Sequence, residues 1–108
     1  MTQTTQFRVV YTTCPDKQTA ETLASAIVEN KLVACVNIVP QITSVYRWQN
    51  KIEKSEELLL IIKTDESHLK SLEAQILELH PYEVPEFIVL PIHSGSESYL
   101  GWVKENLG

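Results

Sequence analysis

The sequence is poor in the residues that mark exported, membrane-spanning or nucleic-acid-binding proteins. It holds two cysteines, three glycines and nine Lys or Arg residues, against fourteen Asp or Glu, for a formal net charge of −5. Because affinity for nucleic acid rests largely on basic side chains that neutralise phosphates, this balance disfavours a nucleic-acid partner. The aliphatic run at 58–62 is far shorter than the roughly 20 residues of a membrane-spanning helix, so we expect no membrane insertion.

The start of the chain and the two cysteines indicate the compartment. Residues 1–7 contain no positively charged start followed by an apolar stretch, so we expect no secretory signal. Without export, Cys14 and Cys35 are predicted to be free thiols in a reducing environment. We therefore predict a cytoplasmic protein.

The scarcity of glycine also narrows the function. Gly95, Gly101 and Gly108 form no glycine-rich loop that could cradle a phosphate, and no arrangement typical of nucleophilic catalysis is present. We therefore predict that the protein is not an enzyme. With 44% hydrophobic and 21% charged residues, the 108-residue chain is long enough for one core, and we predict one domain over residues 1–108.

Hydrophobic periodicity predicts alternating strands and helices. In order, it predicts a strand at 7–13, a helix with Pro15 in its first turn that ends near Asn30, a strand at 32–39 that Pro40 interrupts and that resumes at 42–48, a turn at Gln49–Asn50, a strand at 51–64, a helix at 69–79, a strand at 86–92 and a short helix around 99–103. The order β-α-β-β-α-β followed by α predicts an α+β, ferredoxin-like fold with an extended hairpin and a C-terminal helix.

Local features add detail to these elements. Thr13 is placed to cap the first helix, with Asp16 at its positive end, and Asp65 and Ser67 offer capping oxygens to the second helix. The run at 32–39 is apolar enough for a strand that is covered on both faces, so Cys35 is predicted to lie in the core.

The hairpin at 42–64 is predicted to reach beyond the rest of the sheet, because strands usually run only about five or six residues. Tyr46, Trp48 and Ile52 fall in its distal part, where a small layer of helices cannot cover them. Exposed strand edges and aromatic tips favour pairing with another chain. We predict a homo-oligomer in which the hairpin reaches onto a neighbouring copy.

The segment HPYEVPE at 80–86 is predicted to be a stiff loop that presents titratable side chains, because each proline fixes its own φ and restricts the residue before it. His80 is a candidate metal ligand, and the alternative is a helix C-terminal histidine that interacts with the last carbonyls. Glu83 and Glu86 are candidate ligands or an acid–base pair. The alternative for both is packing against a neighbour or simple solvation.

Further candidates lie outside this loop. Cys14 precedes the first helix, whose N-terminus lowers the pKa of a nearby thiol, so it is a candidate thiolate ligand for copper. A small structural residue is the alternative. Tyr46, Trp48, Tyr82 and Trp102 are candidates for an interface or a ligand cleft, since aromatic side chains serve in both.

Several segments together resemble the CutA divalent-cation-tolerance family, in order and over almost the whole chain. They are YTTCPD at 11–16, KLVACVNI at 31–38, the hairpin with Tyr46 and Trp48, LIIKT at 60–64, HPYEVPE at 80–86 and YLGW at 99–102. The resemblance implies a ferredoxin-like homotrimer, similar in architecture to the PII signalling proteins, with hairpins that form sheets between subunits. It also implies a link to copper and other divalent cations.

For the metal site, the resemblance implies a cysteine on the first strand and two adjacent histidines at the end of the second helix. The matching positions here are Thr12, Leu79 and His80, so only His80 keeps its ligand type, and Cys14 is a candidate substitute. The family's Trp-Glu-Gly hairpin turn reads Trp48-Gln49-Asn50 here, which removes one carboxylate.

These observations lead to one prediction and two alternatives. We predict a homotrimer that binds copper or another divalent cation through His80, Cys14, Glu83 and Glu86 and that acts in cation tolerance. One alternative is a PII-like module that binds a small anion in a cleft between subunits. The other is a very stable scaffold whose role is to bind another protein.

Overall fold

The structure, a computed structural model, describes residues 5–108. Its elements are β1 (Phe7–Cys14), α1 (Lys17–Glu29), β2 (Cys35–Trp48), β3 (Lys51–Asp65), the 3₁₀ turn η1 (Glu66–His68), α2 (Leu69–Leu79), β4 (Ile88–Pro91) and α3 (Glu97–Glu105). The strands form one antiparallel sheet in the order β2-β3-β1-β4. This element order and sheet order are those of the ferredoxin-like α+β fold, so the predicted fold is confirmed.

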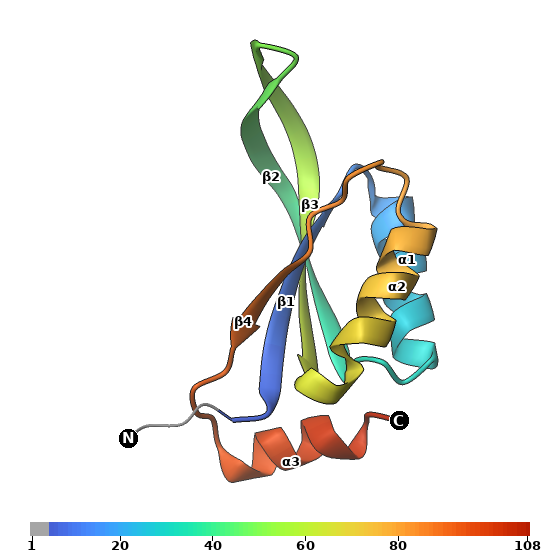
Figure 1. Ribbon diagram of the computed structural model, residues 1–108, viewed down its shortest axis with the longest axis vertical. Coiled ribbons are helices and arrows are strands. Elements are labelled where there is room, and N and C mark those ends of the chain that lie inside the picture. The colour runs from blue at the N-terminus through green and yellow to red at the C-terminus, as the bar shows by residue number, and fades with distance from the viewer. Residues whose placement is uncertain (1–4) are drawn as a thin grey trace.

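One face of the sheet bears the core. Helices α1 and α2 cover this face, while α3 lies across one end of the strands (Figure 1). Every second residue of β1 points toward the helices, because side chains alternate along a strand, and Val10, Thr12 and Cys14 are fully buried. The side chains that complete this core come from α1, β3 and α2: Ala20, Leu23, Ile27, Leu60, Ile62, Leu72 and Ile76.

The opposite face of the sheet lies away from α1 and α2 (Figure 1) and is apolar around β1 and β4, while Lys63 donates a hydrogen bond to Asn37 on the same face. Tyr11 of β1 pairs with Ile61 of β3 and with Ile88 of β4, and Val9 pairs with Leu90. Directly paired residues of antiparallel strands point to the same face, so these side chains form one surface. Ile88 keeps 50% and Leu90 keeps 38% of its surface exposed. The described residues therefore leave an apolar sheet face without a covering layer.

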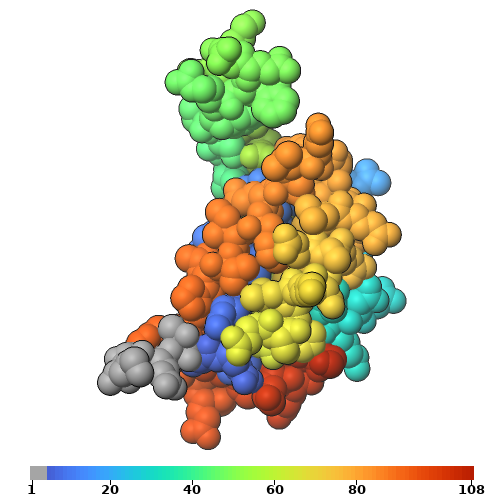
Figure 2. Space-filling view, in the orientation of Figure 1, coloured from blue at the N-terminus to red at the C-terminus, as the bar shows by residue number. Residues whose placement is uncertain are grey.

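The hairpin of β2 and β3 extends past the other strands and ends in a separate knob (Figure 2). Its turn is formed by Gln49 and Asn50, whose φ angles of 50° and 65° are those of a type I′ turn, the type that matches the twist of a hairpin. Trp48 and Ile52 flank this turn and are well over half exposed. The predicted turn and the predicted exposure of the hairpin tip are both confirmed.

A bulge bends β2 where the hairpin leaves the body of the sheet. Val39 pairs with Leu59 and Ile42 pairs with Glu57, so two residues of β2 stand opposite one residue of β3. Gln41 at this point has a φ of 59°. The sequence predicted an interruption at Pro40. The structure shows one continuous strand, because a bulge absorbs the proline without ending the pairing.

The start of β2 differs from the prediction, since the strand begins at Cys35 and not at residue 32. Residues 31 and 32 close the C-terminus of α1. Lys31 has a φ of 58°, its N–H donates to the Val28 carbonyl, and the Leu32 N–H donates to the Ile27 carbonyl. This pair of hydrogen bonds is a Schellman motif with lysine at the position that glycine usually occupies. The helix cap therefore occupies the residues that were assigned to the strand.

The helix caps also differ from the prediction. Asp16, not Thr13, is the N-cap of α1, and its Oδ1 accepts a 2.7 Å hydrogen bond from the Thr19 N–H. Asp65 and Ser67 make no cap bond to α2. The Asp65 carboxylate instead accepts a hydrogen bond from the Ser67 hydroxyl, and α2 is entered through the turn η1.

Two other predictions need correction. The fourth strand is shorter than 86–92, although the Ile92 N–H still donates to the Phe7 carbonyl beyond its end. Cys35 is only half-buried, because it starts an edge strand, and its Sγ lies 3.7 Å from the Tyr99 hydroxyl of α3. β2 is therefore not covered on both faces within one chain. No helix within residues 5–108 is long and apolar enough to cross a membrane.

Candidate functional site

A cleft of about 890 Å³ lies at the base of the hairpin, between β2, β3 and the loop that follows α2. Within residues 5–108, its walls contain three carboxylates and three aromatic rings but no Lys, Arg or His. The lining residues are Thr13, Ser44, Val45, Tyr46, Trp48, Glu57, Tyr82, Glu83, Val84, Pro85 and Glu86. The cleft therefore favours an occupant that carries positive charge or that packs against aromatic rings.

The fold positions these residues through strand alternation and the bulge. Ser44, Tyr46 and Trp48 lie two apart on β2 and point to one side, as the sequence predicted. The bulge sets Ile42 opposite Glu57, which brings Glu57 to the same side of the hairpin. The loop at 82–86 then closes the cleft from the side of α2.

Glu57 is the most deeply placed of the cleft carboxylates, with only 7% of its surface exposed. The Tyr82 hydroxyl donates a 2.7 Å hydrogen bond to Glu57 Oε2. Burial of the phenol and this bond to a carboxylate raise the pKa of Tyr82 well above its usual 10, so Tyr82 is a neutral donor at physiological pH. The pair fixes the loop against the hairpin.

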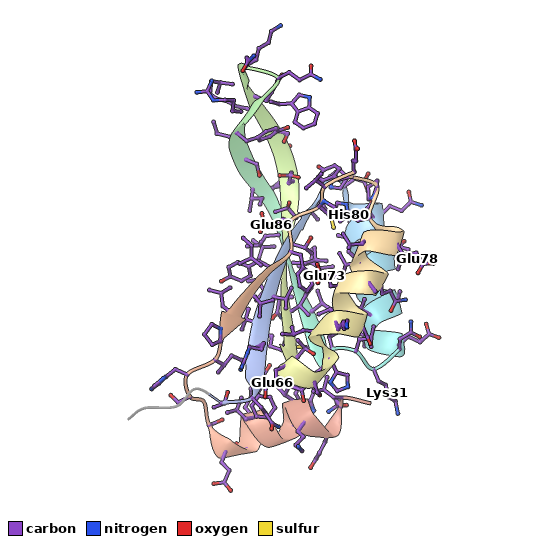
Figure 3. All side chains as sticks on the ribbon, viewed as in Figure 1. Lys31, Glu66, Glu73, Glu78, His80 and Glu86 are labelled. Carbon is purple, nitrogen blue, oxygen red and sulfur yellow. The ribbon has the colours of Figure 1, made fainter. Side chains whose placement is uncertain are left out.

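His80 is buried beneath this loop, with 6% of its surface exposed (Figure 3). The Tyr82 N–H donates to His80 Nδ1 at 3.1 Å, so this nitrogen carries no proton. His80 Nε2 lies 2.7 Å from the Thr13 carbonyl, which can only accept, so Nε2 carries the proton. Both ring nitrogens are thus engaged by the backbone. His80 could reach a metal only by giving up one of these bonds.

Cys14 does not have the predicted thiolate character. It is fully buried, and its pKa is raised to about 11 by burial and by the nearby carboxylates of Asp16 and Glu57. Burial disfavours the charged form, and here it outweighs the helix N-terminus that the prediction relied on. Cys14 does lie on the same side of β1 as Thr12, as strand alternation predicted, but this is the side that faces the core.

The donor set within one chain does not fit a copper site. Among residues 5–108, no three His, Cys, Asp or Glu side chains come close enough together to hold a metal ion. Thr12, at the position that the resemblance assigns to a cysteine, is buried, and its Oγ1 has no hydrogen-bond partner in the described part of the chain. Of the four predicted metal ligands, Glu83 and Glu86 line the cleft, while His80 and Cys14 lie buried beside it.

The predicted aromatic group is divided between two places. Tyr46, Trp48 and Tyr82 line the cleft together. Trp102 lies on α3, at the opposite end of the molecule from the hairpin, where its ring is 5.7 Å from that of Tyr99. Trp102 therefore does not line this cleft, because sequence spacing does not show which end of the sheet a terminal helix crosses, and its place at an interface stays a prediction.

Sequence reasoning missed Glu57. It is the last acidic residue of the polar segment KIEKSEE at 51–57, a pattern that is typical of a solvent-exposed strand. Its position three residues before the buried Leu60, across the hairpin from the interruption at Pro40, was the indication in the sequence that it turns inward.

The fold and the cleft define a class: ferredoxin-like α+β proteins in which an overlong hairpin borders an acidic surface cleft. The sequence profile of the CutA1 divalent ion tolerance protein family matches residues 8–106. The chain belongs to this family.

Individual relatives agree with this assignment. The Divalent-cation tolerance protein CutA of Thermus thermophilus is 48% identical over 100 residues, which cover 93% of this chain and 97% of that protein. The human Protein CutA is 46% identical over 95 residues, which cover 88% of this chain but only 53% of that protein, so this chain spans about half the length of the mammalian relative.

Solved structures show the same fold. The Cut A1 divalent cation tolerance protein from Thermus thermophilus superposes with a TM-score of 0.92 at 47% identity, covering 94% of this chain and 99% of that chain. CutA1 from Oryza sativa superposes with a TM-score of 0.94 at 48% identity, covering 97% of this chain and 96% of that chain.

Proposed function

We propose that this chain acts as a homotrimer in divalent-cation tolerance, by holding divalent cations in the acidic cleft at the boundary between subunits. The observation that supports it best is the acidic cleft at the base of the hairpin, beside the uncovered apolar face of the sheet. The family is named for divalent-cation tolerance, and its name gives no catalytic activity. We accordingly propose binding rather than catalysis.

The uncovered sheet face supports assembly. Val9, Tyr11, Ile61, Ile88 and Leu90 form an apolar surface that would meet water in a lone chain. Burying apolar surface is favourable by about 25 cal/mol per Å², so a face of this kind favours association with further copies. The exposed hairpin tip would add contacts to a neighbour. Three copies is the number that the resemblance implies.

The acidic cleft supports a cation as the ligand. Glu83 and Glu86 offer carboxylate oxygens, which suit hard divalent cations, whereas copper prefers the imidazole and thiolate ligands that His80 and Cys14 do not present. Because one chain brings too few ligands together, we propose that water and a neighbouring subunit complete the coordination. Copper, which the resemblance implies, is the comparison ion in the calorimetric titration.

Sedimentation equilibrium tests the assembly. We expect a mass three times the 12.3 kDa of one chain. Ile61→Lys, on the uncovered face, should shift the mass toward that of one chain. Val28→Lys, on the solvent side of α1, is the matched control and should leave it unchanged. A wild-type mass of one chain at micromolar concentration would refute the assembly.

Calorimetric titration with Mn(II) and Cu(II) tests the cation. The double variant Glu83→Gln/Glu86→Gln should bind Mn(II) at least about tenfold more weakly, since it loses two charged ligands. The control Glu97→Gln/Glu105→Gln removes the same charge from α3 and should bind as the wild type does. Equal affinities for Mn(II) in the two double variants would show that the cleft is not the site.

The two cysteines support a reducing compartment. Neither Cys14 nor Cys35 forms a disulfide, and Cys14 is buried. We therefore propose a cytoplasmic location, which fractionation of cells that express the tagged chain tests. A signal confined to another compartment would contradict it.

A further inference from the structure

The buried carboxylate of Glu57 lacks a charged partner. Among residues 5–108, the ion pairs are Arg8–Glu66, Lys17–Glu21 and Asp65–His68, and none involves Glu57. Glu57 Oε2 accepts the bond from Tyr82, and no hydrogen bond within this part of the chain reaches Oε1. Although only 7% of the Glu57 surface is exposed, Oε1 is not fully enclosed and remains accessible from the cleft, where a cation could pair with it. No ion pair within residues 5–108 therefore balances the negative charge of Glu57.

The rest of the cleft shows what kind of cation would balance this charge. A divalent metal needs several oxygen ligands, and the described residues of one chain bring no three acidic, His or Cys side chains together, so a metal in this cleft relies on water and a neighbouring subunit. The walls instead offer the rings of Tyr46, Trp48 and Tyr82. Aromatic faces attract organic cations but replace none of the water oxygens around a metal ion.

The volume of the cleft and the sign of its charge agree with an organic cation as the occupant. About 890 Å³ lies within the range of roughly 300–1,000 Å³ that small-molecule sites occupy. Glu57, Glu83 and Glu86 all line the cleft, and no basic side chain does. An anionic ligand would therefore meet repulsion, which argues against the alternative of a module that binds a small anion.

We propose that the cleft binds a small organic cation, with a primary ammonium or guanidinium group paired with the Glu57 carboxylate and held against the rings of Tyr46 and Trp48. Glu83 and Glu86 add negative charge at the cleft wall. This role goes beyond divalent-cation binding, because it needs neither a metal nor ligands from a second chain.

Tryptophan fluorescence gives a direct test. The chain contains two tryptophans, so Trp102→Phe leaves Trp48 in the cleft as the only one. We expect agmatine, which carries a guanidinium and an ammonium group, to change the Trp48 emission with a Kd of about 1 mM or tighter. Succinate, an anion of similar length, should produce no saturable change.

Matched variants locate the site. Glu57→Gln keeps an acceptor for the Tyr82 hydroxyl but removes the charge, and it should weaken agmatine binding at least tenfold, about 1.4 kcal/mol. Glu105→Gln removes a charge from α3 and should change Kd less than about twofold, because exposed charges far from a site are screened. If Glu57→Gln does not fold by circular dichroism, Glu83→Gln carries the same test, with a loss of about threefold expected.

The outcomes separate the possibilities. An equal agmatine Kd in Glu57→Gln and wild type, no saturable binding up to about 10 mM, or tighter binding of succinate would each overturn the proposal. An acetylated and amidated Gly-Arg-Gly peptide distinguishes the source of the cation: preference for agmatine identifies a free small molecule, and preference for the peptide identifies a protein side chain. Mn(II) titration is measured separately, so failure here leaves the divalent-cation proposal standing, and the reverse also holds.

Discussion

Replacing His80 by alanine tests whether this imidazole supports the fold or holds a metal. The structure predicts a structural role, because both ring nitrogens bind the backbone: Nε2 donates to the Thr13 carbonyl and Nδ1 accepts from the Tyr82 N–H. Alanine would leave a partly buried acceptor and a partly buried donor unpaired. Each unsatisfied group costs about 1–3 kcal/mol, so we expect His80→Ala to lower the free energy of unfolding by about 2–6 kcal/mol.

The assay is guanidinium chloride unfolding followed by circular dichroism, at equal chain concentrations because the stability of an oligomer depends on concentration. His93→Ala is the control: this histidine is exposed, and its loss should change the free energy of unfolding by less than about 0.5 kcal/mol. The Kd for Cu(II) should be the same in wild type and in His80→Ala. Unchanged stability together with an at least tenfold weaker Cu(II) affinity would refute the structural role and identify His80 as a ligand.

Three further predictions follow from individual residues. The thiol of Cys14 should resist Ellman's reagent at about pH 8 until the protein unfolds, because burial raises its pKa to about 11. The variant Cys35→Ser leaves Cys14 as the only thiol, and rapid labelling of this variant in its folded state would contradict the burial. The hydrogen bond to Asp65 raises the pKa of His68 above its usual 6.5, so its stabilisation is complete below pH 6.5 and is lost as pH rises through the raised pKa. Wild type should therefore lose more stability than His68→Gln in urea unfolding between about pH 6 and 9, and parallel curves would count against the pair. Lys31→Gly should raise the free energy of unfolding by about 1 kcal/mol, because glycine adopts the φ of 58° without strain. A destabilised variant would show that contacts of the lysine side chain outweigh this relief of strain.

The topology could be read from the sequence because it depends on local patterns. Alternation in 7–13 and three-to-four spacing in the helices report burial on one face, and burial decides which way each element packs. The Gln49–Asn50 turn was found in the same way, since it separates two β-rich segments. The error at the start of β2 has a local cause: residues 31 and 32 do not favour strand over helix end by type, and the helix cap that uses them is a backbone arrangement.

The candidate site was less predictable because it depends on contacts between distant segments. The loop at 80–86 stood out in the sequence, and its residues Tyr82, Glu83 and Glu86 line the cleft. Whether His80 is available depends on the Thr13 carbonyl, 67 residues away, which no pattern shows. A bulge on the neighbouring strand brings Glu57 to the inner side of the hairpin. The residues around Glu57 in the sequence are typical of a solvent-exposed strand and do not indicate this position.

Cation binding in the acidic cleft of a trimer is tested most directly by crystals of the protein soaked in Mn(II) and, in parallel, in Cu(II), with the ions located by anomalous scattering. We predict a trimer in which Mn(II) lies in the cleft against Glu83 or Glu86, with remaining ligands from water or a neighbouring subunit. The His80 imidazole should keep its bonds to Thr13 and Tyr82. An ion bound to His80 or Cys14, or a lattice that holds only separate chains with an empty cleft, would contradict this prediction.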